Sequence, residues 1–184
     1  NSKHNQPVAE NVLAQNFVAS LPNEKWGSDI TYIETKEGWL YLAVVLDFYS
    51  RKIVGWAVSD SIDAALCCKA LKMALIRRNP PAELVHHSDR GVQYASSEYR
   101  ALLKARYFTQ SMSRKGNCYD NAMVESFMHT LKVECVRQNR YVSRDSAAQD
   151  VADFIECFYN QRRLHSALDY LSPVEYELKF KLAA

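Results

Sequence analysis

The chain has 184 residues, of which 48% are hydrophobic and 24% are charged, and its formal net charge at pH 7 is +2. This composition is ordinary for a globular protein, and the length suffices for one medium-sized domain, alone or with a small appendage. The longest apolar run, Trp39 to Leu46, is far too short to cross a bilayer, which argues against a membrane protein. The slight positive charge permits nucleic-acid binding without demanding it.

The cysteine pattern and the N-terminal residues bear on the cellular compartment of the protein. The number of cysteines is odd and no Cys-x-x-Cys pair occurs, so a disulfide framework or a zinc cluster is disfavoured. Reduced, mostly buried thiols fit a cytoplasmic protein better. The sequence has no initiating Met and no signal peptide, and we therefore expect an excised fragment of a cytoplasmic protein.

Residue patterns predict an alternating order of strands and helices after an irregular arm at residues 1–21. Runs rich in β-branched and aromatic residues predict an antiparallel meander of three strands, at 29–33, 39–46 and 52–58. The period then changes to that of helices and short strands. We expect helices from a cap at Asp60, Ser61 or Asp63 to Arg78, from Ser96 or Ser97 to about Tyr107, and at 143–161, strands at 84–88 and 108–112, and a capping box at 172–175.

This order predicts a mixed five-stranded sheet with helices on both faces, the layout of the ribonuclease-H-like fold of the α/β class. We expect the core at residues 22–140. Residues 141–184 would form a C-terminal helical extension packed on it.

The stretch from Ser113 to Glu134 combines a polar loop with an amphipathic helix. An apolar stripe on this helix must face a core, and it consists of Val124, Phe127, Met128, Leu131 and Cys135. Glu125, His129 and Lys132 lie together about 100° away. Asp120 or Asn121 is a candidate helix cap, and we interpret Asp120 as a cap and not as a metal ligand.

Three carboxylates are expected to converge near this helix. Asp29 would begin the first strand, Asp89 would end the fourth, and Glu125 occupies the first turns of the helix. The first and fourth strands are neighbours in the predicted sheet, so the two aspartates can meet. Three such groups repel one another unless cations intervene, and hard oxygen ligands suit Mg²⁺ or Mn²⁺. Two ions could activate a nucleophile and stabilise a leaving oxygen of a phosphodiester.

The spacing of these residues and the sequence motifs around them resemble a known family. Fifty-nine residues separate Asp29 from Asp89, thirty-five separate Asp89 from Glu125, and Lys132 follows seven positions later. Four segments carry the resemblance: 26–33 (WGSDITYI), 87–94 (HSDRGVQY), 120–127 (DNAMVESF) and 159–165 (YNQRRLH). They resemble the catalytic core shared by retroviral integrases and Asp-Asp-Glu insertion-sequence transposases, and within it the bacterial group made from two overlapping reading frames.

This resemblance implies DNA cleavage at transposon ends and strand transfer by the freed 3′ hydroxyl. Asp29, Asp89 and Glu125 would hold two Mg²⁺ or Mn²⁺ ions, and DNA ends, target DNA and further copies of the chain would be the partners. A bacterial, nucleoid-associated location follows. Two alternatives stay open: a catalytically inert DNA-binding or assembly module, and a ribonuclease-H-like nuclease.

Other candidates have weaker signals. Cations suited to DNA phosphates occur at Arg114, Lys115, Lys132, Arg162 and Arg163, and His129 is a further candidate contact. His86 and His87 are expected to be structural, and Asp47 is expected to stabilise a turn. Tyr159 with its neighbouring Arg and His residues could suggest a tyrosine recombinase, but these residues are crowded into one segment, which disfavours that reading.

Overall fold

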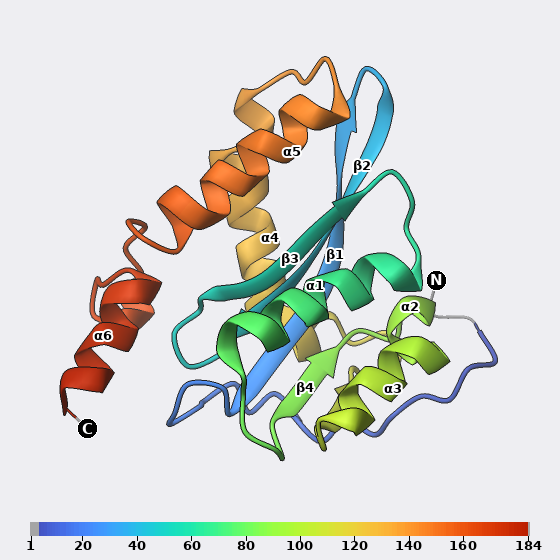
Figure 1. Ribbon diagram of the computed structural model, residues 1–184, viewed down its shortest axis with the longest axis vertical. Helices are drawn as coiled ribbons and strands as arrows, with labels where there is room; N and C mark the ends of the chain where they lie inside the picture. Colours follow the sequence, from blue (N-terminus) through green and yellow to red (C-terminus); the bar gives the residue numbers. More distant parts are fainter. Residues whose placement is uncertain (1–3, 184) are drawn as a thin grey trace.

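A five-stranded mixed sheet forms the centre of the protein in the computed structural model, which describes residues 4–183 (Figure 1). The strands are β1 (Lys25–Thr35), β2 (Gly38–Asp47), β3 (Ile53–Ser59), β4 (Val85–Ser88) and β5 (Thr109–Met112). Their order across the sheet is β3-β2-β1-β4-β5. The first three form the predicted antiparallel meander, and β4 and β5 join it in parallel.

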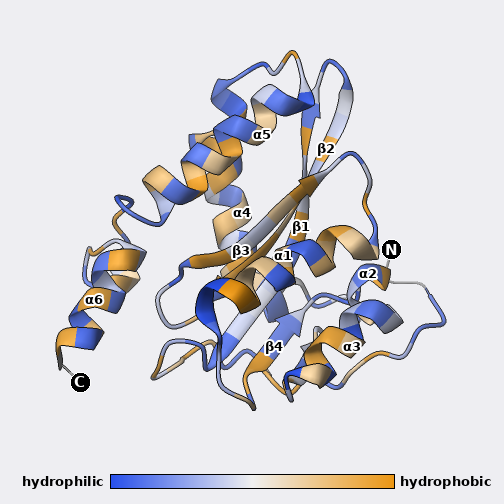
Figure 2. Cartoon of the chain, in the orientation of Figure 1, coloured by the Kyte–Doolittle hydropathy of each residue, from blue (hydrophilic) through white to orange (hydrophobic). Residues whose placement is uncertain are grey.

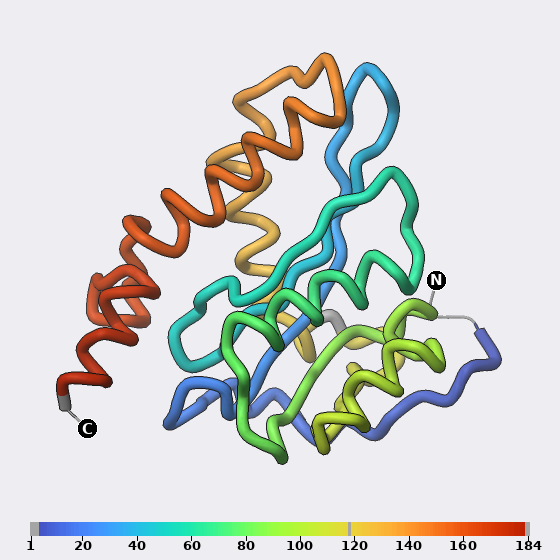
Figure 3. Tube along the Cα trace, in the orientation of Figure 1, coloured from blue at the N-terminus to red at the C-terminus, as the bar shows by residue number. Residues whose placement is uncertain are grey.

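Helices cover both faces of the sheet. They are α1 (Ala64–Arg78), α2 (Val92–Ala95), α3 (Ser97–Ala105), α4 (Ala122–Glu134), α5 (Arg144–Asp153) and α6 (Pro173–Ala183). One buried cluster joins α1 and α3 to the sheet, and a second joins α4 and α5 to its other face. Figure 3 shows the two ends of the chain on opposite sides of the molecule. Within residues 4–183, no helix has both the length and the apolar character that crossing a membrane requires.

The central strand β2 is buried on both faces. Leu42, Val44 and Leu46 belong to the cluster beneath α4 and α5, whereas Ala43 and Val45 pack beneath α1. This alternation explains the unbroken apolar run in the sequence, and it confirms the prediction of a strand covered on both sides. Figure 2 shows the same apolar character along β3.

The helix ends follow the expected side-chain chemistry. Asp63 caps α1 by accepting a hydrogen bond from the Leu66 N–H at 2.9 Å. Ser96 caps α3 in the same way. Before α6, Ser172 and Glu175 exchange the two bonds of a capping box, as predicted.

The structure corrects the sequence analysis at three elements. β1 begins at Lys25 and not at residue 29, because its first four residues pair with β4 and residues 26–28 also pair with β2. The short helix α2 was not predicted, since one turn has no detectable periodicity. The predicted helix over 143–161 is α-helical only to Asp153 and continues as a π-helix over Phe154–Tyr159.

The π-helical segment ends at a residue that is tied to the sheet. The Asn160 side chain accepts from the Ile53 N–H and donates to the Ile53 carbonyl, both at 2.9 Å. Its backbone N–H reaches the Ile155 carbonyl, five residues back. The wider turn therefore places this amide at the start of β3, where it completes the hydrogen bonding of a buried backbone group.

The N-terminal arm, residues 4–21, has no helix or strand and lies along β5. Leu13 is buried in the α4 cluster, and its N–H donates to the Ser111 hydroxyl at 3.0 Å. The Ala9 N–H contacts the Met112 sulfur at 3.4 Å. The arm therefore covers the outer edge of the sheet, which would otherwise offer unpaired backbone groups.

Gly55 marks a close contact between β3 and α1, and it supplies a test of the packing. A Cβ at Gly55 would lie 2.3 Å from the Ala70 carbonyl oxygen and 2.7 Å from the Ala74 nitrogen. Because both atoms are helix backbone, Gly55→Ala must push the helix from the sheet, and we expect a loss of about 2–3 kcal/mol in unfolding free energy.

Urea unfolding gives the measurement, with Gly116→Ala as the comparison. Gly116 has a φ of +73° and no neighbouring atoms where a Cβ would stand, so its replacement should cost only about 1 kcal/mol of backbone strain. Equal losses in the two variants would contradict the packing argument.

Candidate active site

Parallel pairing of β1 and β4 brings two of the predicted carboxylates together. Ser28 and Ser88 are the last paired residues of this ladder, and Asp29 and Asp89 follow them directly. β4 ends there, whereas β1 continues to Thr35. The sequence had suggested that Asp29 begins its strand, but the residue lies within β1. It does stand beside the end of β4, as expected.

The third carboxylate reaches this point because α4 approaches β1 closely. A Cβ at Gly27 would lie 2.6 Å from a methyl of Val124 and 2.5 Å from the Phe48 ring, so only glycine permits this contact. Glu125 follows Val124 in the first turn of α4. The glycine in β1 thus sets the distance between Glu125 and the sheet.

The electrostatics show that the three groups share one neighbourhood. Burial and the charge of Asp89, with a smaller contribution from Glu125, raise the pKa of Asp29 to about 7, although a hydrogen bond from the Ile30 N–H and the charge of Lys132 oppose the shift. Burial and Asp89 also raise the pKa of Glu125. Nearby carboxylate charges that raise the pKa of Asp29 and Glu125 are the kind of repulsion that a bound cation relieves.

The carboxylates are not yet gathered around one point. Asp29 accepts from the Ile30 N–H and Asp89 from the Gly91 N–H, each at 2.8 Å. Over the described residues 4–183, no three His, Cys, Asp or Glu side chains stand close enough together to hold a metal ion. Asp89 and Glu125 are exposed, however, and can change rotamer without repacking the core. The donor set, three carboxylates, fits a hard cation.

A shallow cavity of about 310 Å³ connects two of these groups with basic residues. Asp89 and Glu125 line it together with Arg114 and Lys115, two of the predicted DNA contacts. The cavity therefore offers cations on one side and carboxylates on the other, which suits a phosphodiester held next to a metal site.

Asp120 does not cap α4, which corrects the sequence interpretation. Its side chain is fully buried and accepts hydrogen bonds from the Arg114 backbone N–H and from Nε and Nη2 of the Arg114 guanidinium, between 2.8 and 3.1 Å. Asn11 and Gln15 of the arm donate to the same carboxylate at 2.9 and 2.8 Å. The Arg114 hydrogen bonds hold the pKa of Asp120 far below its usual range.

Asn121 does not cap α4 through its side chain either. Its Nδ2 donates to the Ser28 carbonyl at 3.3 Å, and so joins the start of the helix to β1. Asp120 and Asn121 thus fix the helix from two sides, one through the loop and arm and the other through the sheet.

The remaining predicted contacts divide into two groups. The Lys132 ammonium lies 4.6 Å from the centroid of the Tyr32 ring and is close enough to lower the pKa of Asp29, so it belongs with the carboxylates. His129 is exposed one turn after Glu125. Arg162 is exposed, and Arg163 pairs with Glu134 at 2.8 Å, away from the carboxylates.

The two histidines before Asp89 are structural, as expected. His86 Nε2 lies 3.0 Å from the Ser28 hydroxyl and 3.1 Å from that of Tyr99. His87 lies 2.9 Å from Ser111 Oγ. Burial lowers the pKa of His86 to about 3 and that of His87 to about 4, so both are neutral links between strands and helices.

Asp47 has the expected role at the turn after β2. It accepts from the backbone N–H groups of Asn23 and Tyr49 and pairs with Arg78 at 3.2 Å.

The sheet order and the helices on both faces define a ribonuclease-H-like fold, as the sequence predicted. Two family models described as "Integrase core domain" match residues 19–118 and 125–180. The chain belongs to this integrase core domain family, which confirms the resemblance drawn from the four motifs.

Individual relatives give the same family. The transposase InsF of insertion sequence IS3A from Escherichia coli (strain K12) is 52% identical over 176 residues, which cover 96% of this chain and 61% of that protein. This chain thus spans about three fifths of the length of that curated relative.

Solved structures share the fold at low identity. The simian T-cell lymphotropic virus intasome in complex with a PP2A regulatory subunit has a chain with a TM-score of 0.67 and 20% identity, over 90% of this chain and 56% of that one. The HTLV-2 integrase catalytic core in complex with magnesium has a TM-score of 0.62 and 17% identity, over 86% and 99%.

Because the pKa of Asp29 is raised, the unfolding free energy of the protein should fall as pH rises. The folded protein binds this proton more tightly than the unfolded chain, so ionisation destabilises the fold as pH rises from about 4 to about 7. Without metal, Asp29→Asn should match wild type near pH 4 and become more stable above pH 7. A pKa shift of this size would correspond to roughly 4 kcal/mol of unfolding free energy if it were fully expressed. Because Asp29 is only half-buried and solvent screens its charge, we expect the variant to gain about 1–3 kcal/mol.

Urea unfolding in EDTA at several pH values measures this difference. Asp120→Asn is the contrasting variant, because a lowered pKa gives stability that is present above the unfolded pKa and lost only at acid pH. Its penalty should stay constant between pH 5 and 8. A difference for Asp29→Asn that is also constant over this range would show that the pKa of Asp29 is not raised in the folded protein.

Proposed function

We propose that this chain is the catalytic core of a DNA transposase, which cleaves a phosphodiester at a transposon end and transfers the freed 3′ hydroxyl to another strand. One observation carries the proposal: Asp29, Asp89 and Glu125 come from separate parts of the chain, and yet the charge of Asp89 helps burial to raise the pKa of both Asp29 and Glu125. Perturbed carboxylates beside a basic cavity indicate a functional site. The family and the InsF relative support the same activity.

The same three carboxylates would hold the metal, Mg²⁺ or Mn²⁺, as two ions. The HTLV-2 core was solved with magnesium, and carboxylate oxygens are the donors that this ion prefers. When bound, such ions would activate the attacking oxygen and neutralise the leaving one. Asp29 would be the least mobile ligand, because strand pairing on β1 and the Ile30 hydrogen bond fix it.

The basic residues would bind and orient the DNA. Lys132, Arg114, Lys115 and His129 border the carboxylates and would contact phosphates near the reacting bond, while Arg162 and Arg163 would contact a more distant phosphate. Arg114 is already oriented by Asp120, so less side-chain entropy is lost when it binds.

The wider organisation belongs to the same proposal. Residues 22–140 would form the catalytic core, with the arm at 1–21 and the helical extension at 141–184 packed against it. The chain would associate with further copies on DNA. The HTLV-2 core, which was solved in dimeric and trimeric forms, supports such association.

Removing one carboxylate should abolish the chemistry. Asp29→Asn, Asp89→Asn and Glu125→Gln should each lower metal-dependent cleavage and strand transfer by at least about a hundredfold, because a lost ligand changes both charge and geometry at the metals. Each variant should remain folded by circular dichroism. Electrophoresis of labelled DNA measures cleavage on an uncut transposon end and joining on an end that carries a pre-cut 3′ hydroxyl.

The products separate the candidate functions. Joined strands identify a transposase, nicks without joining identify a nuclease, and neither product under any metal identifies an inert module. Lys69→Ala is the control, because Lys69 is exposed on α1, on the other face of the sheet. A folded triad variant with near wild-type joining would exclude that residue as a ligand.

Lys132→Ala should weaken DNA binding without changing metal affinity. Its ammonium is placed against Tyr32 and beside Asp29, where a phosphate can replace the ring as its partner. We expect a severalfold loss in affinity and a salt dependence reduced by about one released counterion. Fluorescence anisotropy measures affinity against salt, and a fall in metal affinity alone would mean that the role is misassigned.

A further inference from the structure

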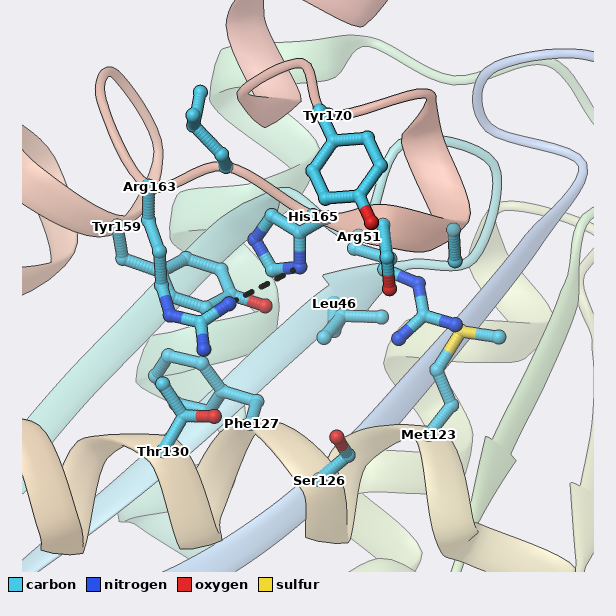
Figure 4. Close-up of a pocket in the computed structure, with 13 residues that line it drawn as sticks. Leu46, Arg51, Met123, Ser126, Phe127, Thr130, Tyr159, Arg163, His165 and Tyr170 are labelled. Carbon is cyan, nitrogen blue, oxygen red and sulfur yellow. Dashed lines mark hydrogen bonds between the residues drawn. The ribbon is translucent and has the colours of Figure 1, made fainter.

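A second polar cavity lies on the neighbouring face of α4, and no catalytic carboxylate borders it (Figure 4). Its volume is about 350 Å³, within the range of small-ligand sites. The walls come from α4, from the turn between β2 and β3, and from the segment that follows the π-helix. Six of its lining residues carry polar or charged groups suited to a ligand: Arg51, Ser126, Thr130, Arg163, His165 and Tyr170.

Two guanidinium groups give the cavity its chemistry. In the described part of the chain, Arg51 has no ion pair and its guanidinium has no hydrogen bond. Arg163 donates three bonds to the Glu134 carboxylate, between 2.8 and 3.1 Å. Figure 4 shows the two groups on either side of His165. One net positive charge therefore remains without an internal partner, and the hydroxyls of Ser126 and Thr130 lie along the same wall.

Buried neighbours hold Arg163 in place. His165 is 8% exposed, and its Nδ1 lies 3.4 Å from an Arg163 nitrogen. Because arginine can only donate, His165 must accept at Nδ1 and is neutral; burial and the charges of Arg163 and Arg51 lower its pKa to about 4. The Tyr159 ring lies 6.0 Å below the guanidinium. The histidine and tyrosine thus position the arginine before any ligand arrives.

Backbone strain gathers at the rim of this cavity. Arg51 has a φ of 58°, and Asp169 and Tyr170 have φ values of 54° and 58°. None is glycine, so each left-handed conformation costs about 1 kcal/mol or more. The strain at Arg51 directs its side chain to the cavity, and the strain at 169–170 places the Tyr170 ring, 71% exposed, at the mouth. Such strain is typical of binding sites.

The position on α4 relates this cavity to the carboxylates. Ser126 lines the cavity, and Glu125 is the preceding residue. The two sites therefore lie on adjacent faces of one helix turn, about 100° apart. A DNA strand that passes the carboxylates and continues across α4 meets the two arginines next.

We propose that this cavity seats a backbone phosphate of the DNA strand beyond the reacting bond, held by Arg51 and Arg163, with an adjoining base against Tyr170. The inference rests on the proposed function, since it takes DNA as the ligand. The side chains of the cavity favour a nucleotide unit: guanidinium groups bind phosphate oxygens, and an exposed aromatic ring stacks on a base. An acidic protein segment would use the arginines but would not need the ring.

Arg51→Gly is the decisive variant, because it removes the guanidinium and also relieves the positive φ. The affinity for a short labelled duplex in EDTA should fall about three- to tenfold at low salt, and the salt slope should decrease by about one. The melting temperature should not fall. Arg51→Lys should recover part of the affinity, since it keeps the charge and loses only the planar fork.

Controls separate this site from general basic attraction. Lys69→Ala removes one charge from the opposite face and should change affinity less than twofold. Tyr170→Ala should weaken single-stranded DNA more than duplex, because unpaired bases are available to stack. If Arg51→Gly binds like wild type, or loses no more than Lys69→Ala, the proposal is wrong.

Two further measurements show whether a negative result concerns the DNA ligand of the cavity or the proposed catalytic function. Poly-glutamate that competes as strongly as DNA at equal charge, with the same dependence on Arg51, would assign the cavity to a protein carboxylate and overturn the DNA assignment. Metal-dependent joining by wild type tests the proposed function separately. Joining with no effect of Arg51→Gly on affinity would overturn only this inference, whereas an Arg51 effect without joining would overturn only the catalytic proposal.

Discussion

The buried carboxylate of Asp120 is the constraint on which the site depends. It receives five hydrogen bonds, from the loop before α4 and from the N-terminal arm, so one side chain joins two segments about a hundred residues apart. A buried charge is stable only when it is fully paired, and here every donor also has a positional role. The loop that carries Arg114 and the first turn of α4 are held as a unit, and Glu125 is positioned with them.

The candidate active site brings negative charges close together. The charge of Asp89 opposes ionisation of Asp29 and of Glu125, whereas the buried histidines that support the strands are neutral. His86 and His87 join β4 to β1, β5 and α3 without adding charge, because burial keeps both rings neutral. Gly27 lets α4 approach the sheet more closely than any side chain would allow. Rigid, uncharged support beneath a repulsive cluster is how a protein keeps a cation site preorganised.

Sequence reasoning reached the fold and the neighbouring positions of the strands that carry Asp29 and Asp89, because both follow from the order and type of the local patterns. The alternation in β2, the caps at Asp63 and Ser96, and the order of strands are visible in short windows. What it missed depends on distant contacts. Asp120 looks like a cap until the donors at Asn11 and Gln15 are known, and those lie in a stretch with no periodicity. The early start of β1 likewise follows from its pairing with β4, about sixty residues later.

The π-helical turn ending at Tyr159 has a consequence for how this fold tolerates length changes. A π-turn holds about one residue more than an α-turn, so the same residues wound as ordinary α-helix would carry the chain one residue further round the helix axis. Everything downstream would then rotate by about 100°. Asn160 would leave Ile53, and Arg163 and His165 would turn away from their cavity. The irregular turn therefore takes up one extra residue and keeps the segment after it in phase with α5, so loss of one residue there should disturb the downstream contacts less than an insertion.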